Sequence, residues 1–218
     1  MQRIDARAIH TFGIPRLLLM EHAGLALARH AHHLYRTRLR TPRRNRPIVI
    51  CCGAGYNGGD GMAAARHLLA WGYRVRVLLT ARASELREEP AVYAQILQRL
   101  GATARAVPRR SVLRWARRQL RGAGLVIDAL LGIGLRASVR EPTASLIAAI
   151  NRSHRPVVAA DVPSGLDADT GHPRGEAVRA TLTVTFGLPK RGCLKGAARP
   201  YVGRLVVEPI TIPPQTMR

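Results

Sequence analysis

Aromatic residues, acidic residues and long apolar runs are all scarce in this chain of 218 residues. Phe, Trp and Tyr make up 4%, which argues against a module that stacks single-stranded nucleic acid on aromatic platforms. No uncharged apolar run reaches the ~18 residues of a membrane span, so we expect no contact with a membrane. The only cysteines, Cys51, Cys52 and Cys193, form no CxxC pair and no zinc spacing, which favours a reducing compartment. Since no signal-peptide pattern is present either, we expect a cytoplasmic protein.

Basic residues are abundant, in contrast to these scarcities. Lys and Arg number 35 against 13 Asp and Glu, which gives a net charge of +22, and Lys190 and Lys195 are the only lysines. The densest basic run covers residues 36–46. Such a surface either is simply solvated or attracts a nucleic acid, an acidic membrane or an anionic ligand. We favour the solvated surface.

Short apolar runs alternate with stretches of helical periodicity along the chain. We predict strands over residues 48–52, 73–79, 103–107, 125–127, 157–160, 182–186 and 204–207. We predict helices over residues 3–12, 15–39, 58–71, 91–100, 111–120 and 142–151. This alternation indicates a mostly parallel sheet with helices on both faces. The expected fold is therefore a single doubly wound, Rossmann-like α/β domain over residues 1–218.

Aspartates are gathered after the predicted strands. The chain has six, and five of them lie in loops that follow apolar runs: Asp60, Asp128, Asp161, Asp167 and Asp169. Ligands of open parallel sheets bind outside the carboxyl ends of the strands, so these carboxylates predict a site at that edge. Aspartate is also common in turns and helix caps. That alternative explains Asp167 and Asp169 well, but it explains Asp128 and Asp161 less well, because each directly follows a strand.

Three loops at this edge carry residues suited to binding. The first (GAGYNGGDG, 53–61) has the spacing GxGxxG between a strand and a helix, and its backbone amides can cradle a phosphate. An acid at Asp60, in the first turn of the helix, argues against an ordinary dehydrogenase, and the lack of GK[ST] excludes a P-loop. The second loop (128–138) offers glycines and Arg136, and the third (161–167) offers Asp161 and Ser164. Each loop could instead be a plain turn.

A cation site is also predicted at this edge. Asn57, Asp128 and Ser164 supply three oxygen ligands, one from each loop. Oxygen ligands without His or Cys suit an alkali or alkaline-earth ion, not zinc. Since a single carboxylate is little charge for a divalent ion, a monovalent ion is the better interpretation.

Together these loops resemble the NAD(P)H-hydrate epimerase family, the YjeF N-terminal domain. The NGGDG and D-[IV]-PSG blocks, in this order and spacing, are highly specific for it. The blocks that carry the resemblance are Phe12–Pro15, Leu19–Gly24, Cys52–Gly61, Asp128–Leu135, Asp161–Asp167, Thr185–Phe186, Pro189–Lys190 and Gly203–Arg204. The chain departs from the family at Tyr56 and His22, where Asn is usual, and at Glu141, where many members have glycine.

The resemblance implies repair of damaged nicotinamide cofactor. Members interconvert the R and S epimers of hydrated NADH or NADPH, which carry a hydroxyl on C6 of the reduced ring. A separate ADP- or ATP-dependent dehydratase specific for the S form then restores the cofactor, and is the implied functional partner. Potassium is implied at Asn57, Asp128 and Ser164. The implied substrate contacts are Tyr56, Asn57, Gly58, Gly59, Asp60, Gly132, Ile133, Gly134, Leu135, Arg136, Ala137, Ser138 and Asp161.

Epimerisation at C6 needs proton transfer to or from oxygen. C6 is a hemiaminal carbon, so either its hydroxyl leaves and returns, or the ring opens and recloses. A carboxylate within hydrogen-bond reach can shuttle the proton on either route. Our hypothesis gives this catalytic role to Asp161, because it follows an apolar strand and precedes Val162 and Pro163.

Two other functions stay under consideration. A non-catalytic RNA- or protein-binding module on the same fold would suit the net charge, although nucleic acid is not the partner we expect. An NADP-dependent oxidoreductase could use GxGxxG together with Arg82, but Asp60 and the lack of a substrate domain disfavour it. The sequence allows a homodimer without predicting one.

Overall fold

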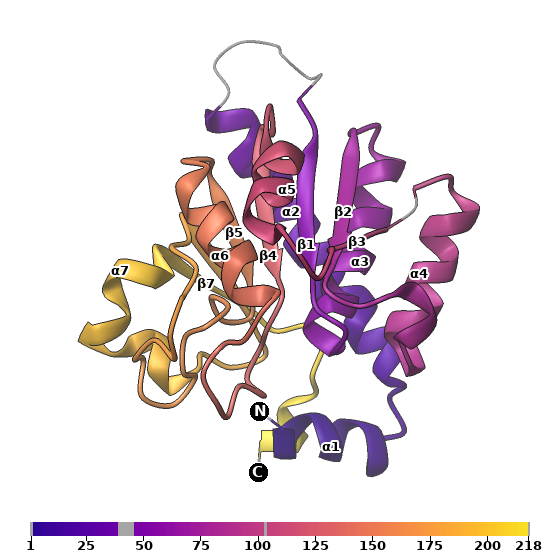
Figure 1. Cartoon of the computed structure of the whole chain (residues 1–218). Coiled ribbons are helices and arrows are strands. Elements are labelled where there is room, and N and C mark those ends of the chain that lie inside the picture. The colour runs from indigo at the N-terminus through magenta and orange to yellow at the C-terminus, as the bar shows by residue number, and fades with distance from the viewer. Residues whose placement is uncertain (1, 39–45, 103, 218) are drawn as a thin grey trace.

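A computed structural model describes residues 2–38, 46–102 and 104–217 of the chain, and its strands form one sheet (Figure 1). The strand order is β3-β2-β1-β4-β5-β6-β7, and every pair of neighbours is parallel. The strands are β1 Ile48–Cys52, β2 Val75–Leu79, β3 Arg105–Ala106, β4 Leu125–Ala129, β5 Val157–Ala160, β6 Leu182–Phe186 and β7 Arg204–Glu208. The predicted α/β fold is confirmed, and its strand order reverses direction between β1 and β4.

Helices cover both faces of this sheet (Figure 1). The helices are α1 Gln2–His10, α2 Arg16–Arg38, α3 Tyr56–Ala70, α4 Glu88–Arg99, α5 Val112–Leu120, α6 Thr143–Arg152 and α7 Arg199–Val202. One core packs α2, α3 and α4 on the sheet, and a second core packs α5 and α6 on the opposite face. None of the helices in the described ranges is both long and apolar enough to cross a membrane.

Strand β1 illustrates why the central strands are apolar throughout. Ile48, Ile50 and Cys52 belong to the core under α2–α4, while Val49 and Cys51 belong to the core under α5 and α6. Successive side chains of a strand point to opposite faces, so a strand buried on both sides needs a continuous apolar run. Both thiols are free and buried, as predicted, and burial raises the pKa of each well above that of an exposed cysteine.

Several predicted boundaries are wrong by a few residues. Helix α3 begins at Tyr56, two residues before the predicted start, so Asp60 lies in its second turn and not in its first. Asp128 lies inside β4 and does not follow it. Four short 3-10 helices (Ala83–Glu85, Arg191–Leu194, Gly196–Ala198 and Pro214–Met217) and α7 carry no periodic signal and are not predicted. Residues 39–45 of the basic run and Thr103 of the third predicted strand lie outside the described residues.

The two ends of the chain meet beneath the carboxyl edge of the sheet (Figure 1). Ala8 of α1, Leu19 of α2 and Ile212 near the C-terminus form a small buried cluster of their own. Apolar side chains at the two chain ends therefore fix α1 across the edge at which the sequence predicts the site.

Candidate functional site

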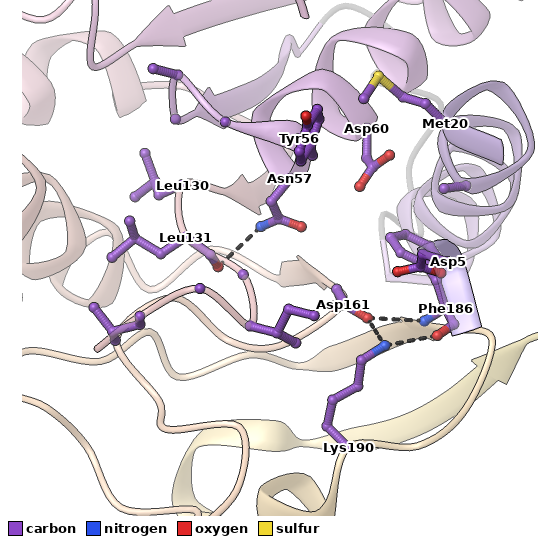
Figure 2. A pocket seen from close by; sticks show the side chains of 18 of the residues that line it. Asp5, Met20, Tyr56, Asn57, Asp60, Leu130, Leu131, Asp161, Phe186 and Lys190 are labelled. Atoms are coloured by element: carbon purple, nitrogen blue, oxygen red, sulfur yellow. Dashed lines mark hydrogen bonds and ion pairs between the residues drawn. The ribbon is translucent and has the colours of Figure 1, made fainter. Parts of the chain in front are cut away.

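A pocket of about 1000 Å³ opens at the carboxyl edge of the sheet, between the loops that follow β1 and β4. This is the point at which the strand order reverses, where ligands of doubly wound sheets bind. Loops after β5 and β6 and the helices α1 and α2 complete its walls (Figure 2).

Most of the predicted substrate residues line this pocket. The lining includes these predicted residues: Tyr56, Asn57, Asp60, Gly132, Ile133, Gly134, Leu135, Arg136, Ala137, Ser138 and Asp161. Gly58 and Gly59 are buried and are not part of the lining, so their substrate role stays a prediction. Asp128 and Ser164 lie fully buried behind the pocket wall.

The two buried glycines allow α3 to pack closely against its surroundings. A Cβ on Gly58 would lie 1.9 Å from the carbonyl oxygen of Gly53, and one on Gly59 would lie 2.5 Å from the sulfur of Met20. A side chain at Gly58 would require the backbone of Gly53 to move, and one at Gly59 would displace the Met20 side chain. These glycines therefore bring the start of α3 against the loop after β1, which places Asn57 and Asp60 at the pocket.

Behind the pocket wall, Asp128 and Ser164 form a closely bonded pair. The Ser164 hydroxyl donates to Asp128 Oδ1 at 2.6 Å, and the Ser164 backbone N–H donates to Oδ2 at 2.8 Å. The Leu131 N–H donates to Ser164 Oγ at 2.8 Å. Burial raises the pKa of Asp128 to about 6, although these hydrogen bonds oppose the shift. The loops after β4 and β5 are thus tied together at this carboxylate.

Asn57 joins the same cluster from α3. Its Nδ2 donates to the carbonyl of Leu131 at 3.0 Å, and the Ser164 hydroxyl lies 3.2 Å from the same carbonyl. Asn57 Oδ1 is buried and has no hydrogen-bond partner among the described residues. A buried amide oxygen without a donor is rare, and a bound cation would satisfy it. The three predicted cation ligands therefore converge around Leu131, and the oxygen-only set with one carboxylate fits a monovalent ion.

Asp161 is the acid that enters the pocket from the sheet. It directly follows β5, as predicted, with a left-handed backbone (φ 65°) that is uncommon outside glycine and asparagine or aspartate. Its Oδ1 accepts hydrogen bonds from Thr185 Oγ1 at 3.2 Å, from the Phe186 N–H at 3.1 Å and from Lys190 Nζ. Lys190 also donates to the Phe186 carbonyl at 2.7 Å (Figure 2). All three hydrogen bonds to Asp161 end on Oδ1, and Oδ2 accepts none of them.

Comparison with known proteins identifies the family. The model of the family described as YjeF-related protein N-terminus matches residues 16–192. This chain belongs to that family. The crystal structure of yeast ynu0, YNL200c, superimposes with a TM-score of 0.76 at 25% identity, over 87% of this chain and 78% of the yeast chain.

Curated relatives of this YjeF-related chain include bifunctional repair enzymes and proteins named NAD(P)H-hydrate epimerase. The bifunctional NAD(P)H-hydrate repair enzyme Nnr of Pyrobaculum aerophilum is 48% identical over 205 residues, which are 93% of this chain. The chain spans 39% of the length of that relative. The NAD(P)H-hydrate epimerase of Limosilactobacillus reuteri (strain ATCC 55730 / SD2112) is 38% identical over 207 residues, which cover 95% of this chain and 91% of the relative.

Lys190 is the most important pocket residue that was not among the predicted site residues of this YjeF-related chain. It is buried and forms an ion pair with Asp161. The signal that could have revealed it is its residue type, because lysine occurs only twice beside 33 arginines. The compact ammonium of Lys190 donates both to Asp161 Oδ1 and to the Phe186 carbonyl in this buried position.

Asp5 of α1 and Arg16 of α2 were also missed, since no local pattern links them to loops that lie 40 residues or more further along the chain. Asp5 lines the pocket beside Lys190 and Asp161 (Figure 2). Burial raises its pKa, and the charge of Lys190 opposes this shift. Arg16 donates to the hydroxyl of Tyr56 at 2.8 Å and lies 4.5 Å from its ring centre. Tyr56, the departure from the family pattern, thus anchors a pocket arginine.

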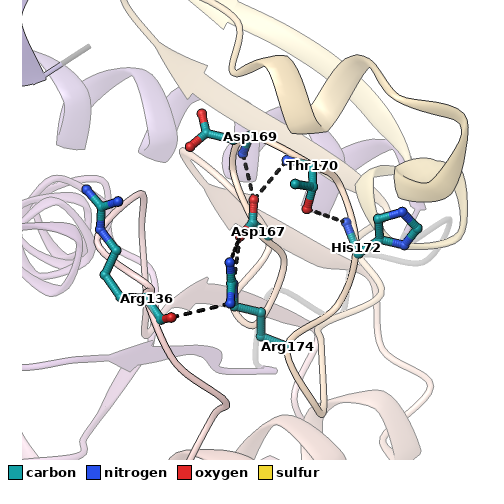
Figure 3. Close-up of polar contacts among 6 residues, drawn as sticks. All are labelled: Arg136, Asp167, Asp169, Thr170, His172 and Arg174. Atoms are coloured by element: carbon teal, nitrogen blue, oxygen red, sulfur yellow. Dashed lines mark hydrogen bonds and ion pairs between the residues drawn. The ribbon is translucent and has the colours of Figure 1, made fainter.

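A second ion pair holds the loop that carries Arg136 (Figure 3). Asp167 Oδ1 accepts from the backbone N–H groups of Asp169 and Thr170 at 2.9 and 2.8 Å. Its Oδ2 accepts from Arg174 Nε at 2.6 Å and from Nη2 at 2.5 Å. Arg174 Nη1 also donates to the Arg136 carbonyl at 3.3 Å. These bonds, with the one from Thr170 foremost, hold the pKa of Asp167 well below its usual range.

Proposed function

We propose that this chain interconverts the R and S epimers of hydrated NADH and NADPH at C6 of the nicotinamide ring. The observation that carries the proposal is Asp161, a pocket carboxylate fixed through one oxygen by Lys190 beside two glycine-rich loops. The relative from Limosilactobacillus reuteri named NAD(P)H-hydrate epimerase supports it, because this chain covers 91% of that protein.

The pocket offers suitable charges for a dinucleotide. Arg16, Arg136 and Arg140 line it, and they can neutralise the pyrophosphate or a ribose phosphate. Helix α3 begins at Tyr56, a pocket residue, and the backbone N–H groups of a helix's first turn can bind a phosphate. In this proposal the phosphates lie at the arginine and helix end, and the nicotinamide ring lies at Asp161.

Asp161 is the group that moves the proton in this proposal. Three donors hold Oδ1, so the carboxyl group is fixed in one orientation, and Oδ2 can take a proton from, or return one to, the oxygen on C6. Lys190 contributes by positioning this carboxylate and by supplying its counter-charge in a buried site.

Potassium is proposed at the cluster behind the pocket wall. Asn57 Oδ1, Asp128 and Ser164 would hold it, and the unpartnered Asn57 oxygen is the observation that favours a cation there. The ion would supply a positive charge that fixes the three loops relative to one another. Every proton transfer in the proposal is left to protein side chains.

The proposed partner is a dehydratase that consumes the S epimer. Relatives named bifunctional NAD(P)H-hydrate repair enzyme support this link, since this chain matches 39% of the length of one of them. We also propose a cytoplasmic location, which the three free cysteines support, because thiols persist in reducing compartments. A homodimer stays a prediction. A non-catalytic RNA- or protein-binding module is disfavoured, because the proposed cation ligands and the proposed catalytic Asp161 are all present at the same edge of the sheet.

Proton NMR of hydrated NADPH, added as the R epimer, tests the proposal. The purified chain in potassium buffer should convert R to S faster than the buffer alone, and tetramethylammonium in place of potassium should slow conversion or weaken binding. If the chain in potassium buffer converts R to S no faster than the spontaneous reaction, the proposal is wrong. Salt-dependent retention of RNA on a filter by such an inactive chain would favour the binding module.

A further inference from the structure

Asp60 is a second pocket carboxyl, and its environment differs from that of Asp161. It projects from α3 into the pocket, which Asp161 and Lys190 enter from the opposite side (Figure 2). Within residues 2–38, 46–102 and 104–217, its side chain makes no hydrogen bond and no ion pair. A carboxyl group that lines a pocket without a protein partner is available to a ligand.

Negative charge surrounds Asp60 more than positive charge does. The titratable groups that face it are Asp5 of α1, Asp161, Lys190, Tyr93 of α4 and Cys52 of β1. Burial raises the pKa of Asp60 well above its ordinary value, Asp161 and Asp5 raise it further, and Lys190 opposes them. Lys190 is bonded to Asp161, so its charge is already compensated there. Burial and the two neighbouring carboxyl groups therefore both favour the neutral, protonated form of Asp60.

A purely structural role does not account for Asp60. It lies in the second turn of α3, beyond the first turn where an acid caps or interacts well with the helix dipole. It also bonds to no loop, in contrast to Asp128 and Asp167. What remains is its orientation toward the space that the substrate would fill.

We propose that Asp60 is a second catalytic residue, the proton donor that works opposite Asp161, an inference that rests on the proposed epimerase function. The Asp60 carboxyl gives its proton to the hydroxyl on C6. The C–O bond breaks, its electron pair leaves with water, and the lone pair of N1 forms the C6=N1 double bond.

Water then adds to the other face of C6, and the step balances without an oxidant or a reductant. A lone pair of the water oxygen forms the new C–O bond, the C6=N1 π pair returns to N1, and Asp161 takes the surplus proton. The epimer has inverted, and one proton has passed from Asp60 to Asp161. In the opposite direction the two acids exchange roles, as microscopic reversibility requires.

The test compares Asp60→Asn with the wild-type chain in potassium buffer. The kcat for R-to-S conversion should fall about 10²–10⁴-fold, because an amide cannot supply the proton. The Kd for the hydrate, from equilibrium titration, should change less than about threefold. Asp169→Asn is the matched control: it makes the same change on an exposed aspartate outside the pocket and should keep the wild-type rate. Asp60→Ala is a second variant, in case Asp60→Asn fails to fold.

The outcomes separate this inference from the proposed function. If the wild-type chain converts no hydrate, the proposed function fails, and the role of Asp60 with it. If the wild type is active and the folded Asp60 variants keep its rate within twofold, only the role of Asp60 is overturned. Conversion in oxygen-18 water adds a measurement on the wild type. Solvent label in the S product, above the enzyme-free level, supports cleavage of the C–O bond, and retention of the original oxygen contradicts it.

Discussion

Two aspartate ion pairs lie six residues apart after β5, and they are built differently. Both carboxylate oxygens of Asp167 accept bonds, Oδ1 from two backbone N–H groups and Oδ2 from Arg174, which also donates to the Arg136 carbonyl. Asp161 and Lys190 use only one carboxylate oxygen, and that pair lines the pocket. The first arrangement fixes a loop in place. The second holds a carboxylate through Oδ1, and no described residue donates a hydrogen bond to its Oδ2.

The difference lies in the second carboxylate oxygen. Arg174 and Lys190 each contact a single oxygen of their partner, but the backbone N–H groups of Asp169 and Thr170 occupy the other oxygen of Asp167. No described residue donates a hydrogen bond to the second oxygen of Asp161. We therefore expect that removing the charge of Asp161 lowers turnover, and that removing the charge of Arg174 or Asp167 weakens binding or stability.

The largest expected effect comes from Asp161→Asn. Turnover of hydrated NADPH should fall about 10²–10⁴-fold, because the amide cannot accept the proton, while hydrate binding changes little. The measurement is kcat from NMR progress curves together with the Kd from titration. Asp169→Asn serves as the control. If turnover stays at the wild-type level, Asp161 has no catalytic role, and the two ion pairs do not differ in function as we expect.

Arg174→Ala should act on binding more than on turnover. The loop that carries Arg136 loses its bond from Arg174, so we expect KM for the hydrate to rise about tenfold, the equivalent of roughly 1.4 kcal/mol, with kcat reduced less. The matched control is Arg152→Ala, at an exposed arginine at the end of α6. A fall in kcat at unchanged KM would mean that the Asp167–Arg174 pair acts in the catalytic step, which would contradict the division of roles.

Acid should reveal the pair of Asp167 and Arg174 as a stability element. The folded pKa of Asp167 is below its unfolded value of 3.8, so its contribution is complete above about pH 4 and is lost as pH falls toward the folded pKa. Urea unfolding of the wild type should lose about 1–3 kcal/mol from this source on acidification. Asp167→Asn should be less stable at neutral pH and should show a flatter acid limb. If the free energy of unfolding of the variant and that of the wild type fall equally as the pH is lowered, the assignment is wrong.

Tyr56→Asn should have the smallest effect. It restores the residue usual in the family and removes the bond and the ring contact to Arg16. Because Arg16 keeps its ion pairs with Glu88 and Glu89, we expect KM to change less than about threefold. A tenfold change would make Tyr56 a specificity residue of this chain.

Much of the fold is readable from local pattern. The bounds of β1, β5 and β6 agree residue by residue with the predicted strands, because strands buried on both faces give continuous apolar runs. The start of α3 was predicted too late because Gly55 offers no side-chain cap and the following glycines are poor helix formers. The segment packs closely against Gly53 and Met20, a tertiary contact that local helix propensity does not reveal.

The sequence by itself determined the parallel sheet, the edge that carries the aspartates and the three loops that supply oxygen ligands, since periodicity and strand-end chemistry are local properties. Only the tertiary structure decided which carboxyl groups have partners. Lys190 reaches Asp161 across 29 residues of chain, whereas Asp60 makes no hydrogen bond or ion pair with any of the described residues. Whether a carboxyl group is charged or neutral depends on desolvation and on charges brought near by folding, and no spacing along the chain encodes either.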